Sequence, residues 1–206
     1  MDKLSLDHIY RASHVLKSVI RQTNLIKTQI MNEEIYLKPE NLQVTGSFKV
    51  RGSGYMISQL SAEEREKGVI ACSAGNHAQG VALAAKTYGI PAIICLPEGA
   101  PISKVEATKS YGAEVRLIPG VYDDAYKYAL NLKEEKGLAF VHPFDNPLVI
   151  AGQGTIGLEI LDELPDVDQV IVPIGGGGLA SGVAYAIKQL NPKIKVIGVE
   201  PAGRFL

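Results

Sequence analysis

A single lysine stands among small residues in the stretch GSFKVRG (residues 46–52), which follows a β-rich run and opens a helical pattern. Lys49 therefore falls near a helix N-terminus, where the backbone dipoles disfavour a cation. Its neighbours Phe48 and Val50 supply apolar surface that would desolvate the amine. Both effects lower the pKa of a lysine, as an amine that attacks a carbonyl group requires. The alternative is a solvated lysine in the first helical turn.

A second loop, SAGNHAQG (residues 73–80), joins a β-rich run that ends at Cys72 to a helix that starts near Asn76. Its small residues let backbone N–H groups approach a ligand, and the helix N-terminus favours an anion such as a carboxylate. The side chain of Asn76 can donate a hydrogen bond to a phenolic or carboxyl oxygen. The same residues also fit a plain strand-to-helix turn, in which Asn76 is the N-cap and His77 is exposed.

A third loop, PIGGGGLASG (residues 173–182), places four consecutive glycines between a β-rich run and a helix. Packing explains such a run poorly, whereas a nest of N–H groups around a phosphate at a helix N-terminus explains it well. The range 175–180 also satisfies the dinucleotide pattern G-x-G-x-x-[GA], and Glu200 follows where a ribose-binding acid would stand. The P-loop pattern does not occur.

Taken together, the three loops offer an amine, a site for a carboxylate and a site for a phosphate. A dinucleotide enzyme uses the third loop but has no need of the first. A phosphorylated aldehyde cofactor uses all three, because its carbonyl takes the lysine, its phosphate takes the glycines and the substrate carboxylate lies beside its ring. The sequence therefore favours the aldehyde cofactor, with Phe48 packed against its ring.

The elements that would position these loops alternate between short apolar runs and amphipathic segments after a first helix over 6–20. The expected strands are 35–37, 69–72, 92–96, 114–118, 139–141, 170–173 and 195–199. The further expected helices include 76–88, 103–111, 122–135, 156–164 and 179–190. Apolar strands separated by helices predict parallel strands covered on both faces. A capping box at Ser61 and Glu64 marks one more helix start.

Composition narrows the class of protein further. A formal net charge of −1 argues against general binding to nucleic acid or to an anionic membrane. Cys72 and Cys95 end apolar runs, so they are expected to be buried free thiols, which favours a reducing compartment. The N-terminal residues lack signal or transit features, and no run approaches the roughly 18 apolar residues of a membrane span. We therefore expect a cytoplasmic protein.

Three motifs, KPENLQVTGSFKVRG, SAGNHAQG and VPIGGGGLASG, stand in an order and at a separation that resemble the fold-type II pyridoxal-phosphate enzymes. The resemblance is nearest to the threonine dehydratase branch, which includes serine dehydratases and serine racemases, and it covers essentially the whole chain. It implies an α/β fold of the tryptophan synthase β type, with two three-layer domains built on parallel sheets. Residues 1–52 and 145–206 would form an incomplete large domain, and residues 53–144 an inserted small domain.

The resemblance also implies a role for each loop. Lys49 would be the Schiff-base lysine, Phe48 would stack beside the pyridine ring, and Asn76 would bond the ring hydroxyl of pyridoxal 5'-phosphate. The residues that would hold its phosphate are Gly175, Gly176, Gly177, Gly178 and Leu179. The residues that would receive the substrate carboxylate are Ser73, Gly75, Asn76 and His77.

The chemistry that the resemblance implies is β-elimination from L-threonine or L-serine, which yields a 2-oxo acid and ammonia. The sequence does not decide between these two substrates. Racemases of the branch carry a serine proton donor where this chain has Ala74, so we expect dehydration rather than racemisation. Some relatives bind a divalent metal beside Glu200, but their later acidic ligand would fall at Leu206, so no metal site is predicted.

Relatives of this branch continue beyond the point where this chain stops. We therefore expect an incomplete large domain, weak cofactor binding, low dehydratase activity, and self-association or pairing with another chain. Inhibition by isoleucine through a regulatory domain is not expected. Two alternatives stay open, a dinucleotide-binding oxidoreductase that uses the glycine loop, and a scaffold that keeps the fold without the chemistry.

Overall fold

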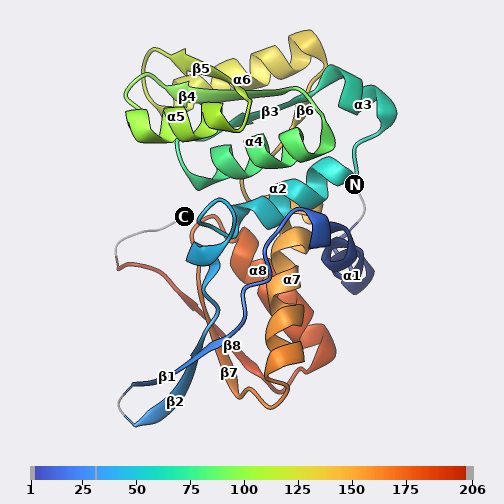
Figure 1. Cartoon of the computed structure of the whole chain (residues 1–206), viewed down its shortest axis with the longest axis vertical. Helices are drawn as coiled ribbons and strands as arrows, with labels where there is room; N and C mark the ends of the chain where they lie inside the picture. The colour runs from blue at the N-terminus through green and yellow to red at the C-terminus, as the bar shows by residue number, and fades with distance from the viewer. Residues whose placement is uncertain (1–2, 31, 203–206) are drawn as a thin grey trace.

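The computed structural model describes residues 3–30 and 32–202, and its strands form three sheets. A four-stranded sheet with its helices occupies one half, and a helical layer with two small sheets occupies the other (Figure 1). Helix α2 (Lys49–Ser58) lies between the halves and packs on α4 (Asn76–Tyr88) in one and α7 (Pro147–Glu163) in the other. The position of α2 places the GSFKVRG stretch where both halves meet.

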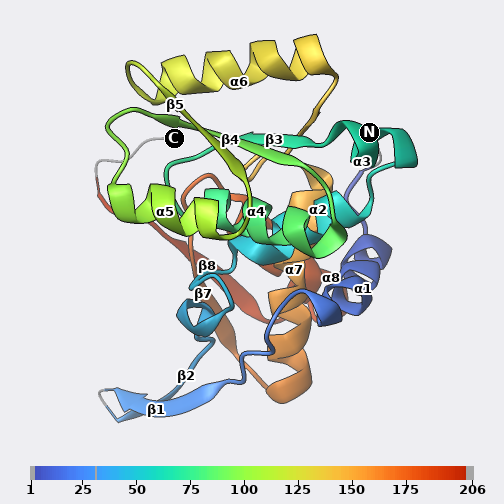
Figure 2. The same cartoon turned by 45° about the horizontal axis from the view of Figure 1, so that its top comes forward.

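The four-stranded sheet is entirely parallel and has the strand order β5-β4-β3-β6. Its strands are β3 (Val69–Cys72), β4 (Ala92–Pro97), β5 (Glu114–Ile118) and β6 (Ala139–Phe140). Helices α4 and α5 (Ile102–Ser110) cover one face and α6 (Tyr122–Lys136) covers the other (Figure 2). Alternate residues of β3 pack toward opposite helices, which is why it is an unbroken apolar run.

The other half packs α7 against α1 (Leu6–Val15) and α8 (Gly178–Leu190), beside a parallel pair of strands, β7 (Gln169–Pro173) and β8 (Lys195–Val199). Glycines let α7 and α8 approach closely, because a Cβ on Gly182 would lie 2.3 Å from the carbonyl oxygen of Ile150.

The helix predicted over 156–164 is thus longer than expected. Helix α7 begins at Pro147, behind the N-cap Asn146, whose side chain accepts hydrogen bonds from two backbone N–H groups of the first turn. The prediction missed its first half because Gly152 and Gly154 lower the local helix propensity. The N-cap asparagine followed by proline at the first helical position was the available signal.

The strand predicted over 35–37 lies within β2 (Glu33–Leu37), but the expectation that it is parallel is wrong. It pairs antiparallel with β1 (Ile26–Ile30), which the sequence analysis missed, and Asn32 between them has a φ of 65°. The hairpin projects from the body of the protein (Figure 1) and most of its side chains are exposed. With little core to enter, these strands carry only a weak apolar signal.

Two predicted helix starts agree with the structure, and one predicted helix end does not. The capping box is confirmed, since Ser61 Oγ accepts from the Glu64 N–H at 3.2 Å and the Glu64 carboxylate accepts from the Ser61 N–H at 2.8 Å, at the start of α3 (Ala62–Lys67). The first helix begins at Leu6 as predicted but is shorter than the predicted range 6–20, because the α-helix ends at Val15 and continues only as a 3-10 turn, η1 (Leu16–Ser18). A second 3-10 turn, η2 (Glu40–Leu42), follows β2.

The division of the chain at 52/53 and 144/145 stays a prediction. Position 52 lies inside α2, so that boundary cuts a continuous helix. Among the described residues, no helix is both long enough and apolar enough to span a membrane. Leu206, named above for its place in a metal site, lies outside the described residues.

Candidate active site

Lys49 is the first residue of α2, and the N-cap residue of this helix, Phe48, makes no side-chain capping hydrogen bond. The Lys49 Nζ donates a hydrogen bond to the carbonyl oxygen of Pro143 at 2.7 Å and lies 5.4 Å from the centroid of the Phe48 ring. Burial lowers the pKa of Lys49 below its ordinary value. The direction agrees with the desolvation predicted from the sequence, and the alternative of a solvated lysine is wrong.

The asparagine loop ends in a helix start without a side-chain cap. Helix α4 begins at Asn76 behind Gly75, so Asn76 is not the N-cap and its side chain is exposed. Ser73 Oγ accepts a hydrogen bond from the Gly75 N–H at 3.2 Å. A Cβ on Gly75 would meet no described atom within 4 Å. The space beside Gly75, at the N-terminal end of α4, is therefore open, and a helix N-terminus suits an anionic group.

His77 is buried, with 3% of its surface exposed, so the alternative of an exposed histidine is wrong. Burial lowers the pKa of His77 to about 3, and the neutral ring donates its Nε2–H to the carbonyl oxygen of Val141 at 2.8 Å. The His77 side chain thus anchors the segment that follows β6. If His77 binds the substrate carboxylate, the backbone N–H of His77 would be the donor, because its side chain is bonded to Val141.

The four glycines that precede α8 divide into two pairs. Gly175 and Gly177 have φ values of +130° and +83°, which side chains rarely adopt. A Cβ on Gly176 would lie 2.2 Å from the ring of Phe144, and one on Gly178 would lie 2.8 Å from the Phe144 carbonyl oxygen. The expectation that packing explains this run poorly is therefore wrong for half of it. The first pair is glycine for its conformation, the second for packing.

One segment, 141–146, contacts all three loops, and the sequence analysis did not single it out. The carbonyl oxygens of Val141 and Pro143 accept from α4 and α2, and Phe144 packs on the glycine loop. His142 Nδ1 accepts from the N–H groups of Phe144 at 3.3 Å and Asp145 at 2.7 Å, which fixes the turn. Its place directly after a parallel strand was the available signal, because ligands bind beyond the carboxyl ends of such strands.

The segment thereby joins the starts of α2, α4 and α8, and none of the three has a side-chain cap in the described structure. Each start presents the positive end of a helix dipole. At α2 the Lys49 N–H donates to Ser47 Oγ at 3.2 Å and the Arg51 N–H donates to the Phe48 carbonyl oxygen at 3.0 Å, so the starts of α4 and α8 are the ones that suit an anion. Such an arrangement can bind two anionic groups around one amine of lowered pKa.

Residues 16–204 match the protein-family model described as pyridoxal-phosphate dependent enzyme. The chain belongs to this family. It is 56% identical to an L-threonine ammonia-lyase of Thermotoga maritima over 96% of its own length and 50% of that protein. The chain thus spans about half the length of this curated relative, and another match, an L-threonine ammonia-lyase of Geobacter sulfurreducens, is covered to 49%.

Solved structures agree with the family assignment. The chain matches threonine deaminase isoform 2 of Solanum lycopersicum with a TM-score of 0.91 at 43% identity, over 96% of this chain and 60% of that one. It matches maize serine racemase with a TM-score of 0.94 at 38% identity, over 98% of this chain and 63% of that one. These matches confirm the predicted fold class, and they do not favour a dinucleotide-binding oxidoreductase.

Pyridoxal phosphate, the cofactor of the family, fits the residues described. Gly175 leaves open space before the uncapped start of α8, which suits a phosphate, and a Cβ added at Gly177 would lie 4.0 Å from Ser181 Oγ. The Lys49 amine has a pKa lowered by burial, as a carbonyl-binding lysine requires.

Proposed function

We propose that this site binds pyridoxal phosphate through Lys49 and converts L-threonine or L-serine to a 2-oxo acid and ammonia. The observation that carries the proposal is the 141–146 segment, which joins the Lys49 amine, the start of α4 and the glycine loop in one place. Relatives named L-threonine ammonia-lyase and threonine deaminase support the substrate class.

The glycine loop and the asparagine loop bind and orient in this proposal. The N–H groups before and within the first turn of α8, over Gly175–Leu179, hold the phosphate. Asn76, exposed at the first position of α4, donates to the ring hydroxyl. The N–H groups of the loop over 73–77 hold the substrate carboxylate, and Phe48 packs beside the ring. The two anions thus lie at two separate helix starts, where the dipoles favour them.

Lys49 moves the proton. Bound pyridoxal phosphate supplies an electron sink for the electron pair left at the substrate α-carbon. Lys49 Nζ accepts the α-proton, and burial lowers the pKa of this amine, which favours the neutral form that the step requires. Pro143 accepts a hydrogen bond from the same amine and so limits where Nζ can lie. The β-hydroxyl is lost as water, and hydrolysis then releases ammonia and the 2-oxo acid.

Ala74 bears on which reaction follows proton removal. Its methyl side chain is half-buried against the apolar core of the four-stranded sheet and carries no exchangeable proton. Return of a proton to the opposite face of the substrate therefore lacks a donor at this position, which favours elimination over racemisation.

We further propose a small amino acid as the only ligand besides the cofactor, self-association, and a cytoplasmic location. Cys72 and Cys95 are free and buried, and burial raises the pKa of their thiols to about 12 and about 11, which suits a reducing compartment. The net charge of −1 gives no general attraction for nucleic acid or anionic membranes.

The test is cofactor uptake and product formation by the purified chain. Added pyridoxal phosphate should give an absorption band in the violet region, and L-threonine should then yield 2-oxobutanoate. Lys49→Ala should abolish both, whereas Lys86→Ala, at an exposed lysine of α4, should abolish neither. A protein that takes up no cofactor, or a band and product that survive Lys49→Ala, would contradict the proposal.

A further inference from the structure

A fully buried arginine lies two residues after Lys49 in the first turn of α2. The guanidinium of Arg51 donates through Nε and Nη2 to the Glu40 carboxylate, both at 2.8 Å. Through Nη1 and Nη2 it also donates to both oxygens of Glu159, and through Nη1 to Thr155 Oγ1 at 3.1 Å. These contacts use all five N–H donors of the side chain. The motif residues around Lys49 therefore include a fully satisfied buried cation.

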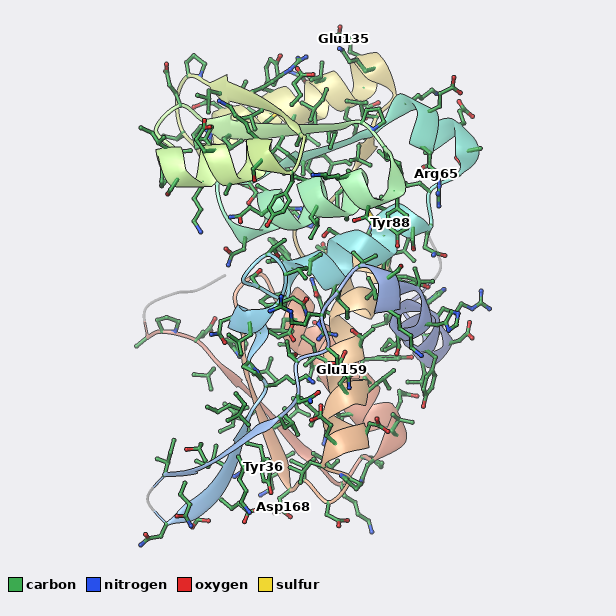
Figure 3. All side chains as sticks on the ribbon, in the orientation of Figure 1. Tyr36, Arg65, Tyr88, Glu135, Glu159 and Asp168 are labelled. Atoms are coloured by element: carbon green, nitrogen blue, oxygen red, sulfur yellow. The ribbon has the colours of Figure 1, made fainter. Side chains whose placement is uncertain are left out.

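The contacts continue into a network of alternating charges. Lys38 Nζ, with its side chain 8% exposed, lies 2.7 Å from Glu159 Oε2 and 3.2 Å from Glu163 Oε1. Burial favours a raised pKa for Glu159, but the hydrogen bonds from Arg51 and Lys38 outweigh it and lower that pKa. We call Lys38, Glu40, Arg51, Thr155, Glu159 and Glu163 the Arg51 network. Figure 3 shows Glu159 on α7, below α2, so the network ties α2 to α7 and to the chain between β2 and α2.

Stability alone is a weak reason for such a network. Buried ion pairs often contribute no more than apolar side chains of similar volume, and a cation in the first turn opposes the helix dipole. What an arginine fork adds is geometry, because two parallel N–H···O bonds to each carboxylate restrict both distance and direction. Arg51 binds carboxylates from two different segments and so restricts rotation of the first turn of α2.

The turn carries Lys49 on its other side. Successive residues in an α-helix differ by about 100°, so side chains two positions apart leave the helix on nearly opposite faces. Holding Arg51 against Glu40 and Glu159 therefore sets the direction in which the Lys49 side chain leaves α2. Burial lowers the Lys49 pKa, so a change in the direction of this side chain changes how far the amine is desolvated.

We infer that Arg51 is a positioning residue for Lys49, whose two carboxylate contacts orient the first turn of α2 so that the amine stays against Pro143. The inference rests on the proposed function, in which Lys49 is the reacting amine. Loss of the fork lets the turn rotate and brings the amine into water.

The test replaces the fork and keeps the charge. Arg51→Lys retains a cation but cannot bind two carboxylates bidentately. The matched control is Arg65→Lys, because Arg65 clamps the opposite end of α2 through the carbonyl oxygens of Leu60 at 3.0 Å and Ser58 at 2.6 Å (Figure 3 labels Arg65). Glu40→Gln serves as a second test variant, because it weakens the same fork from the other partner.

The readout needs no cofactor. The rate at which acetic anhydride acylates Lys49 is followed against pH by mass spectrometry, in the wild-type chain and in each variant. His77 and His142 interact electrostatically with this amine, and burial lowers the pKa of both from the ordinary value of 6.5, so the rates are measured above pH 8, where neither ring changes charge. The midpoint is the pH at which the rate reaches half of its maximum. Arg51→Lys and Glu40→Gln should raise this midpoint by about one pH unit, which lowers the acylation rate at pH values well below it about tenfold. Arg65→Lys should leave the midpoint unchanged.

Two results would overturn the inference. The first is a Lys49 midpoint that is the same in Arg51→Lys as in the wild type. The second is an equal shift in Arg51→Lys and Arg65→Lys, which would show general loosening of α2. A wild-type chain that takes up no pyridoxal phosphate would contradict the proposed function instead, and the acylation midpoints would still decide the role of Arg51.

Discussion

Replacing Gly176 by alanine should force the Phe144 ring away from the glycine loop. The added Cβ would lie 2.2 Å from Cδ1 and 2.3 Å from Cγ of that ring. Carbon atoms in contact sit about 3.5–4.0 Å apart, so the ring must move by more than about 1 Å. The move is restricted, because the ring packs edge-on against His142 with 4.8 Å between centroids and the Phe144 backbone lies against Gly178.

The energies follow from these contacts. Overpacking of this kind costs about 1–3 kcal/mol. Phe144→Ala removes a half-buried ring and should cost about 2 kcal/mol, less than the roughly 3–5 kcal/mol of a fully buried phenylalanine. In the double variant the new methyl group meets no ring, so the loss should fall short of the sum of the single losses by about 1–2 kcal/mol.

Urea unfolding of the wild type, both single variants and the double variant measures this coupling. Gly175→Ala is the matched control, because Gly175 has a φ of +130° and open space around its Cβ position. Its cost of about 1–3 kcal/mol is backbone strain and should not depend on Phe144. Additive losses for Gly176→Ala and Phe144→Ala, within about 0.5 kcal/mol, would refute the packing explanation.

Three further predictions concern His77, Ala74 and the exposed face of β7 and β8. The pKa of His77 is lowered to about 3, so between about pH 3 and pH 6.5 the unfolded chain binds a proton that the folded chain does not. The free energy of unfolding should therefore rise with pH in this range, by up to about 1.4 kcal/mol per pH unit. Urea unfolding at a series of pH values should show a smaller slope for His77→Gln than for the wild type. With L-serine and cofactor, pyruvate should form faster than D-serine because of Ala74, and chiral chromatography showing the reverse would contradict this. Strands β7 and β8 expose Ile171 (64%) and Ile197 (40%), so light scattering should show that the chain self-associates. The double variant Ile171→Thr with Ile197→Thr should self-associate less. A stable wild-type monomer would count against this prediction.

The parallel sheet was predictable because burial on both faces leaves a plain signal. All four residues of β3 are buried, and the predicted range 69–72 matches the strand. The β1–β2 hairpin lacks that signal, since its side chains are mostly exposed, and the sequence predicted only residues 35–37 of it as a strand. Helix α7 was half-missed for the opposite reason, because the glycines that permit its close packing also weaken its helical pattern.

The chemical groups of the site were easier to predict than the contacts that hold them. A lysine among apolar neighbours predicts a lowered pKa, and the structure agrees for Lys49. The 141–146 segment acts largely through the carbonyl oxygens of Val141 and Pro143, which every residue type possesses, so its side chains did not reveal it. Arg51 meets Glu159 across 108 positions of sequence, a pairing that no local pattern indicates.

The residue that binds the cofactor can be located directly. The chain is incubated with pyridoxal phosphate, reduced with borohydride, digested and analysed by mass spectrometry. We predict a pyridoxyl group on Lys49, with Lys38 unmodified because its amine is buried and paired with Glu159 and Glu163. Modification spread over exposed lysines, or a cofactor-binding chain in which Lys49 stays unmodified, would contradict the assignment of Lys49.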